Sequence, residues 1–123
     1  MKVAINRCFG GFGISNTAFE KLLERKGIAF EKVPAKFALR GDDSDYYKAG
    51  SPHSNATYIT SYEFYEDRSD PDLIAVIEEF KEEANSWAAD IAIVEIPDDV
   101  EWYIHEYDGM EHVAENHRTW YGD

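Results

Sequence analysis

The sequence is poor in cysteine and lacks long apolar runs, and each shortage excludes a class of protein. Its one cysteine, Cys8, cannot form an intramolecular disulfide, and the first residues lack the basic and apolar pattern of a secretion signal. We therefore expect a cytoplasmic protein. No apolar run approaches the ~18 residues that a membrane helix needs, so we expect no membrane association.

Cations are also scarce. There are 12 Lys and Arg residues against 25 Asp and Glu residues, which gives a formal net charge of −13. This charge repels polyanions, so we expect no nucleic acid polymer as a partner. A small anionic ligand stays compatible with it, because two or three arginines in a concave site act within a Debye length of about 8 Å. The charge also permits an acidic inhibitor that imitates DNA and blocks a host protein.

What the chain does contain is enough apolar material for one core. It has 123 residues, of which 44% are hydrophobic and 15% are aromatic. This composition is typical of a folded domain rather than a disordered acidic tail. We expect a single domain over residues 1–123, because the chain is too short for two ordinary domains.

The first half of the chain predicts a β–α–β start. Residues 2–6 and 28–33 have the composition of strands, and residues 16–26 have the apolar spacing of a helix. Ser15 or Thr17 can cap that helix, and Gly27 can end it in a left-handed conformation. Turn-forming residues at 40–55 predict a long surface loop, and residues 56–65 favour a strand.

The second half predicts one helix and a hairpin. Asp70 and Pro71 are typical of a helix start, and the apolar stripe that follows continues to Trp87. Residues 91–96 predict a central strand, residues 100–107 alternate with period two, and Asp108 with Gly109 predicts a type I′ turn before a strand at 110–115. The fold class is therefore α+β, with two helices packed on a mostly antiparallel sheet and a C-terminal β-meander. The exposed sheet face would carry tyrosines that form a subunit interface, namely Tyr58, Tyr62, Tyr103 and Tyr107.

The turn between the first strand and the first helix is the main candidate site. It reads Gly10-Gly11-Phe12-Gly13, and Arg7 and Phe9 precede it. Glycines let backbone N–H groups approach an anion, and a helix N-terminus adds partial positive charge. The turn lacks the spacing of a dinucleotide-binding motif or a P-loop, so a tight turn with no ligand is an equally good explanation.

Other candidates also have two explanations. His117, Arg118, Thr119 and Trp120 can clamp a phosphate and stack on a purine, or can only tie down the chain end. Arg68 can face a ligand or pair with a local acid. The remaining histidines lack a metal-binding spacing, and no motif places a base beside Cys8. We therefore expect no enzyme, no metal and no cofactor, with a nucleotide hydrolase as an alternative.

Three blocks of the sequence together resemble the phage Thoeris anti-defence protein type 1 family. The blocks are residues 2–15, residues 68–77, and residues 94–109 with His117 to Trp120. The segment 35–66 does not take part in the resemblance.

The resemblance implies a non-catalytic sponge. Such a protein sequesters a cyclic ADP-ribose-type signal of the host's Thoeris defence in the bacterial cytosol, without cleaving it. It also implies a homo-oligomer with ligand sites at subunit interfaces, and some members of the family hold cyclic oligonucleotides as well. Chemistry within the matching blocks gives the candidate ligand-binding residues: Arg7, Phe9, Gly10, Gly11, Phe12, Arg68, His117, Arg118, Thr119 and Trp120.

Overall fold

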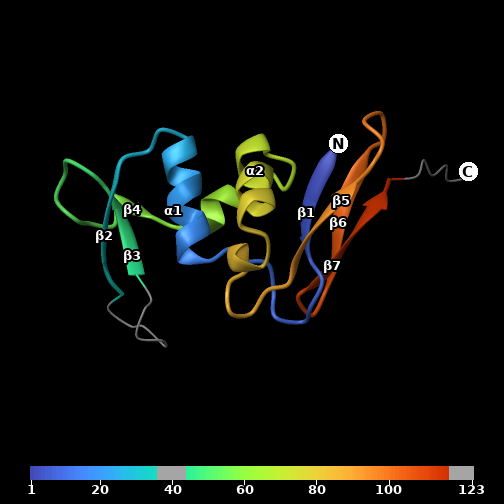
Figure 1. Ribbon diagram of the computed structural model, residues 1–123, viewed down its shortest axis with the longest axis horizontal. Helices are drawn as coiled ribbons and strands as arrows, with labels where there is room; N and C mark the ends of the chain where they lie inside the picture. The colour runs from blue at the N-terminus through green and yellow to red at the C-terminus, as the bar shows by residue number, and fades with distance from the viewer. Residues whose placement is uncertain (36–43, 117–123) are drawn as a thin grey trace, which may run out of the picture.

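Two helices lie in the middle of the molecule, between strands on either side (Figure 1). A computed structural model describes residues 1–35 and 44–116. Strands β2 (Phe30–Pro34), β3 (Ser44–Lys48) and β4 (Tyr58–Ile59) lie on one side of the helices. Strands β1 (Lys2–Asn6), β5 (Ile91–Glu95), β6 (Trp102–Tyr107) and β7 (Met110–Glu115) lie on the other. The predicted α+β class is confirmed.

Helix α1 (Asn16–Arg25) forms as the apolar spacing predicts, with Ala18, Phe19, Leu22 and Leu23 buried on one face. Ser15, and not Thr17, is its N-cap: the Ser15 hydroxyl accepts a hydrogen bond from the Ala18 amide at 3.2 Å. Gly27 follows the helix with a φ of 72°, a left-handed conformation that glycine adopts without strain.

Helix α2 (Pro71–Phe80) starts as predicted but ends seven residues before Trp87. The Asp70 carboxylate caps it by accepting from the Leu73 amide at 3.2 Å. After Phe80 the chain turns at Lys81, whose φ is 54°, into a 3-10 helix, η2 (Lys81–Ala84). This turn brings the backbone of residues 84–86 to the first loop, where Ser15 N donates to Ala84 O and Ser86 N donates to Gly13 O. The prediction of one helix through Trp87 is wrong because these contacts redirect the chain.

Within residues 1–35 and 44–116, the strands form three separate antiparallel sheets rather than one. β1 pairs with β5, and their register places Lys2 opposite Glu95 and Asn6 opposite Ile91. β2 pairs with β3 instead of joining β1, so the predicted β–α–β start is wrong. Among the described residues, β5 is hydrogen-bonded only to β1, so it is an edge strand there and the predicted central position is wrong.

The sheet of β2, β3 and β4 differs most from the sequence-based expectation. β3 lies inside the segment 40–55, which predicted only a loop, because Tyr46 alternates inward and is buried against Phe19 and Phe30. Of the strand expected at 56–65, two residues pair as β4, and η1 (Ser61–Phe64) follows as a 3-10 helix. Local composition did not indicate these tertiary contacts.

β6 and β7 form the predicted hairpin. Asp108 and Gly109 both have positive φ, 54° and 91°, as a type I′ turn requires. The exposed tyrosines do not share one sheet face, however. Tyr58 and Tyr62 belong to the β4 and η1 region, whereas Tyr103 and Tyr107 lie on β6, on the other side of the two helices (Figure 1). The predicted four-tyrosine face is therefore wrong.

Candidate functional site

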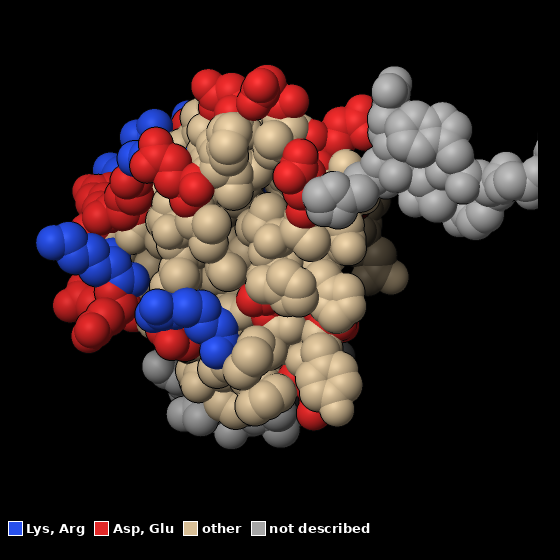
Figure 2. Space-filling model, turned by 90° about the vertical axis from the view of Figure 1, so that its right-hand side faces the viewer, with Lys and Arg blue, Asp and Glu red and all other residues tan. Residues whose placement is uncertain are grey.

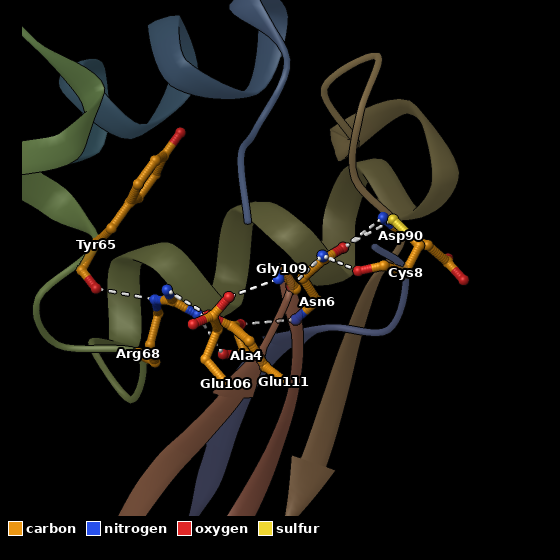
Figure 3. Close-up of polar contacts among 9 residues, drawn as sticks. All are labelled: Ala4, Asn6, Cys8, Tyr65, Arg68, Asp90, Glu106, Gly109 and Glu111. Atoms are coloured by element: carbon orange, nitrogen blue, oxygen red, sulfur yellow. Dashed lines mark hydrogen bonds and ion pairs between the residues drawn. The ribbon is translucent and has the colours of Figure 1, made fainter. Parts of the chain in front are cut away.

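A buried asparagine at the end of β1 joins three loops that lie far apart in the sequence (Figure 3). The Asn6 side-chain amide donates to the carbonyl oxygens of Cys8 and Gly109, each at 2.7 Å. Its side-chain oxygen accepts from the Asp90 amide at 2.8 Å. Asn6 therefore fixes the loop after β1, the loop before β5 and the β6–β7 turn against one another. We call this arrangement the Asn6 junction.

The junction explains much of the glycine-rich turn without a ligand. A Cβ atom on Gly10 would lie 1.7 Å from the Ala88 carbonyl oxygen, and one on Gly13 would lie 2.8 Å from the Ser86 hydroxyl. At Gly10 the obstacle is backbone, so only a residue without a Cβ fits there, whereas the Ser86 hydroxyl beside Gly13 can rotate away. Gly11 differs: its φ is 103°, and a Cβ there would meet no atom within 4 Å. Gly10 is thus required for packing between loops, and Gly13 lies in close contact with the Ser86 side chain.

Arg68 is held inside the protein by several oxygen atoms (Figure 3). Its two terminal nitrogens bind the Glu111 carboxylate at 2.7 and 3.0 Å, and its Nε donates to the Tyr65 carbonyl at 2.8 Å. The Arg68 and Glu111 side chains are only 13% and 7% exposed. The same carboxylate accepts a hydrogen bond from the backbone N–H of Asn6 at 2.9 Å. The guanidinium is therefore occupied by protein groups, which favours the local ion pair over a ligand contact.

Phe12 and Phe9 have different environments although both belong to the predicted stacking surface. The Phe12 ring packs edge-on against Tyr65 at 4.9 Å, and the Arg68 guanidinium lies 3.7 Å from its centroid. Both contacts make Phe12 part of the interior packing. Phe9, in contrast, is 62% exposed. Of these two rings, Phe9 is the one that is open to a ligand.

Two further exposed aromatic residues are carried by the segments that meet at the Asn6 junction. Trp87 precedes Ala88, which packs on Gly10, and Tyr107 immediately precedes the β6–β7 turn. Trp87 is 73% exposed and Tyr107 is 72% exposed. The three carrier segments lie together at the lower edge of Figure 1. We call Phe9, Trp87 and Tyr107 the tip surface.

A groove that carries two cations begins next to the junction. Its volume is about 290 Å³, and its lining includes Arg7, Lys81, Asn85 and Asp90. Arg7 is 60% exposed and makes one long contact with Asp90, 3.5 Å between Nη2 and Oδ1. Glu78 and Glu82 also line the groove, so its charge is mixed. An anionic group could bind here only next to Arg7 and Lys81.

His117, Arg118, Thr119 and Trp120 lie outside the described residues. Cys8 lies at the junction, where its sulfur donates to the Ala88 carbonyl at 3.1 Å and to the Asn6 side-chain oxygen at 3.3 Å. Its thiol therefore contacts two neutral oxygen acceptors rather than a base.

Comparison with protein-family models, curated proteins and solved structures finds no match to this chain. The resemblance to the Thoeris anti-defence family therefore stays a prediction. Among the residues that the structure describes, neither α-helix has the length and apolar composition needed to cross a membrane.

Sequence analysis missed Asn6 and Glu111, the residues that organise the site. Each had a detectable signal. Asn6 is a polar residue that ends an apolar strand. Glu111 is two residues before Val113 on β7, so both side chains lie on the same, inward face of the strand. Neither pattern predicts the hydrogen-bond partner, because Gly109 is far from Asn6 in the sequence and Arg68 is far from Glu111.

Proposed function

We propose that the protein is a non-catalytic sponge that captures a small nucleotide signal of the cyclic ADP-ribose type on the tip surface. The observation that carries this proposal is that the segments bearing Phe9, Trp87 and Tyr107 meet at the Asn6 junction, and that each of these side chains is more than 60% exposed. Each ring offers a flat face, and stacking on a base contributes about 1–3 kcal/mol. A buried asparagine holds the carrier loops in place, so the backbone of the site is organised before ligand binding.

Charge at the groove supports an anionic ligand. Arg7 lies two residues before Phe9 in the chain, and the ion pair that it makes with Asp90 is long and exposed. A pyrophosphate oxygen could replace that contact with a shorter charge-assisted hydrogen bond, which is worth about 1.5–3 kcal/mol. The net charge of −13 acts over longer distances and is screened beyond about 8 Å.

The chemistry of the junction supports binding without turnover. The Cys8 thiol is held by a backbone carbonyl and an amide oxygen. A cysteine nucleophile needs an electropositive environment or an adjacent base. The proposed role of the site is therefore to stack and hold the ligand. In the sponge, slow release matters more than chemistry.

The proposal is tested by isothermal titration calorimetry with cyclic ADP-ribose isomers. Phe9→Ala and Tyr107→Ala should each weaken binding about 5- to 150-fold, the range that corresponds to 1–3 kcal/mol. Tyr62→Ala is the matched control, since this tyrosine is equally exposed, at 74%, but lies in η1, outside the tip surface. Equal affinity in all three variants would remove the tip surface from the site.

The released ligand separates the sponge from its two alternatives. After incubation with the products of a TIR-domain enzyme, heat denaturation of the protein should release the nucleotide intact. A chemically altered product would indicate a nucleotide hydrolase. No nucleotide binding, together with salt-sensitive binding to a basic protein, would indicate an acidic inhibitor that imitates DNA.

A further inference from the structure

Two histidines face each other on the outer side of the C-terminal hairpin. His105 on β6 is directly opposite His112 on β7, and the centroids of their rings are 4.8 Å apart at an interplanar angle of 38°. Both residues are exposed. They are seven residues apart in the sequence, which matches no common metal-binding spacing, so only the strand register brings them together.

The pair has the chemistry and proximity to share one metal ion. Neutral imidazole is a preferred ligand of zinc, with Zn–N distances of about 2.0–2.1 Å, so two nitrogens on a tetrahedral zinc are about 3.3 Å apart. Exposed imidazoles 4.8 Å apart can reach that spacing by small side-chain rotations. Within the described part of one chain, no group of three or more His, Cys, Asp or Glu residues could hold a metal. One chain therefore supplies two of the four ligands of a structural zinc site.

The surface around the pair suits a second copy of the chain. Strand alternation places Tyr103, Tyr107 and Met110 on the same outer face as the two histidines. The hairpin glutamates, Glu106, Glu111 and Glu115, are on the opposite face by the same alternation. Figure 2 shows the side of the molecule that lies at the right of Figure 1, where most of the surface in the centre is neutral, acidic residues gather at the left and top, and a few acidic atoms show between the neutral residues in the centre and below.

Charge and symmetry select the occupant of this face. Two copies with a charge of −13 each repel one another wherever carboxylates meet, so a face whose strand positions carry none favours contact between copies. A twofold dimer uses the same patch on both subunits, so it would set one histidine pair against another. Four imidazoles around one ion form a complete tetrahedral shell.

We propose that His105 and His112 chelate zinc, and that a second copy of the chain completes the site with the same pair across a twofold axis. This zinc-dependent interface goes beyond the proposed function and lies next to its nucleotide site. Tyr107 is shared by the two surfaces, since it belongs to the outer hairpin face and to the tip surface.

The test titrates the metal-free protein with zinc alone and follows heat by calorimetry and mass by sedimentation velocity. One zinc should bind per two chains, and the molar mass should double. His105→Ala and His112→Ala should each reduce zinc affinity at least tenfold and abolish the doubling. His53→Ala is the matched control, because His53 is stacked on Tyr47 and bound to Glu31 at 2.8 Å, away from the hairpin. It should bind zinc and dimerise as the unaltered chain does.

Three results would overturn the proposal. They are the absence of saturable zinc binding, binding at one zinc per chain without a change in mass, and unchanged binding in both hairpin variants. His117→Ala serves as a further control, because this histidine lies outside the described residues and near the hairpin in the sequence. A loss of zinc affinity in this variant alone would also refute the assignment. Since no nucleotide is present, failure here leaves the nucleotide proposal unaffected.

Discussion

Substitution of Glu111 by glutamine should destabilise the protein far more than loss of a surface ion pair. The change keeps the shape of the side chain and an oxygen that can accept the hydrogen bond from the Asn6 backbone N–H. It removes the negative charge that faces Arg68. The Arg68 side chain is 13% exposed, so its guanidinium is left with little water to solvate it. Removing one partner of a buried pair costs about 3–5 kcal/mol, because the remaining charge is uncompensated.

Glu78→Gln is the matched control. It breaks the contact of 2.8 Å between Lys2 Nζ and the Glu78 carboxylate, but both side chains there are nearly half exposed, at 45% and 46%. An exposed pair of this kind contributes little to stability, because water solvates both charges. The two substitutions make the same chemical change, so the difference between them isolates the effect of burial.

Urea unfolding followed by circular dichroism measures the difference. With a slope m of about 1.5 kcal/mol per molar urea, a loss of 3–5 kcal/mol lowers the midpoint by roughly 2–3 M. If the urea midpoint of Glu111→Gln equals that of Glu78→Gln, the buried Arg68–Glu111 pair does not stabilise the fold more than an exposed pair does. The double substitution Arg68→Met with Glu111→Leu should recover most of the lost stability, because apolar residues replace both charges. A double variant that is less stable than both single variants would contradict the same reasoning.

Two further predictions concern the first loop and the behaviour at high pH. Gly10→Ala should lower the free energy of unfolding by about 1–3 kcal/mol or more, because its Cβ would lie 1.7 Å from the Ala88 carbonyl oxygen; an unchanged thermal midpoint would show that the two loops do not pack as described. Burial, followed by the hydrogen bond to Glu20, raises the pKa of Tyr46 above its ordinary value of 10.0. The folded protein therefore keeps a proton that the unfolded chain releases, so this stabilisation is present below about pH 10 and is lost as the pH rises, at up to about 1.4 kcal/mol per pH unit. Tyr46→Phe should flatten the stability curve above pH 10, and an equally steep curve in that variant would count against the prediction.

Local sequence patterns predicted the elements whose formation depends on neighbouring residues. The Asp70-Pro71 start of α2, the positive φ of Gly27 and the Asp108-Gly109 turn are all confirmed. Each is set by steric and hydrogen-bonding preferences that act within a few residues, so the chain carries the information in short segments. Tyr46 shows where this fails, since β3 forms inside a turn-rich segment because its ring packs on Phe19 and Phe30.

The candidate site depended more strongly on tertiary structure. The glycines were found from the sequence, but the reason for Gly10 is a carbonyl 78 residues further along the chain, at Ala88. The sequence made Arg68 a candidate ligand-binding residue with a local ion pair as the alternative, and the structure pairs it with Glu111, which lies on the inward face of β7.

The sequence alone therefore determined the acidic surface, the α+β class, both helix starts and the hairpin turn, because composition and contacts between near neighbours decide these features. Only the tertiary structure decided that Asn6 ties three loops together, that Arg68 is occupied by Glu111, and that His105 meets His112. The physical reason is that hydrogen bonds and strand register join residues that are distant along the chain, and a local pattern does not specify which remote group will lie within 3 Å.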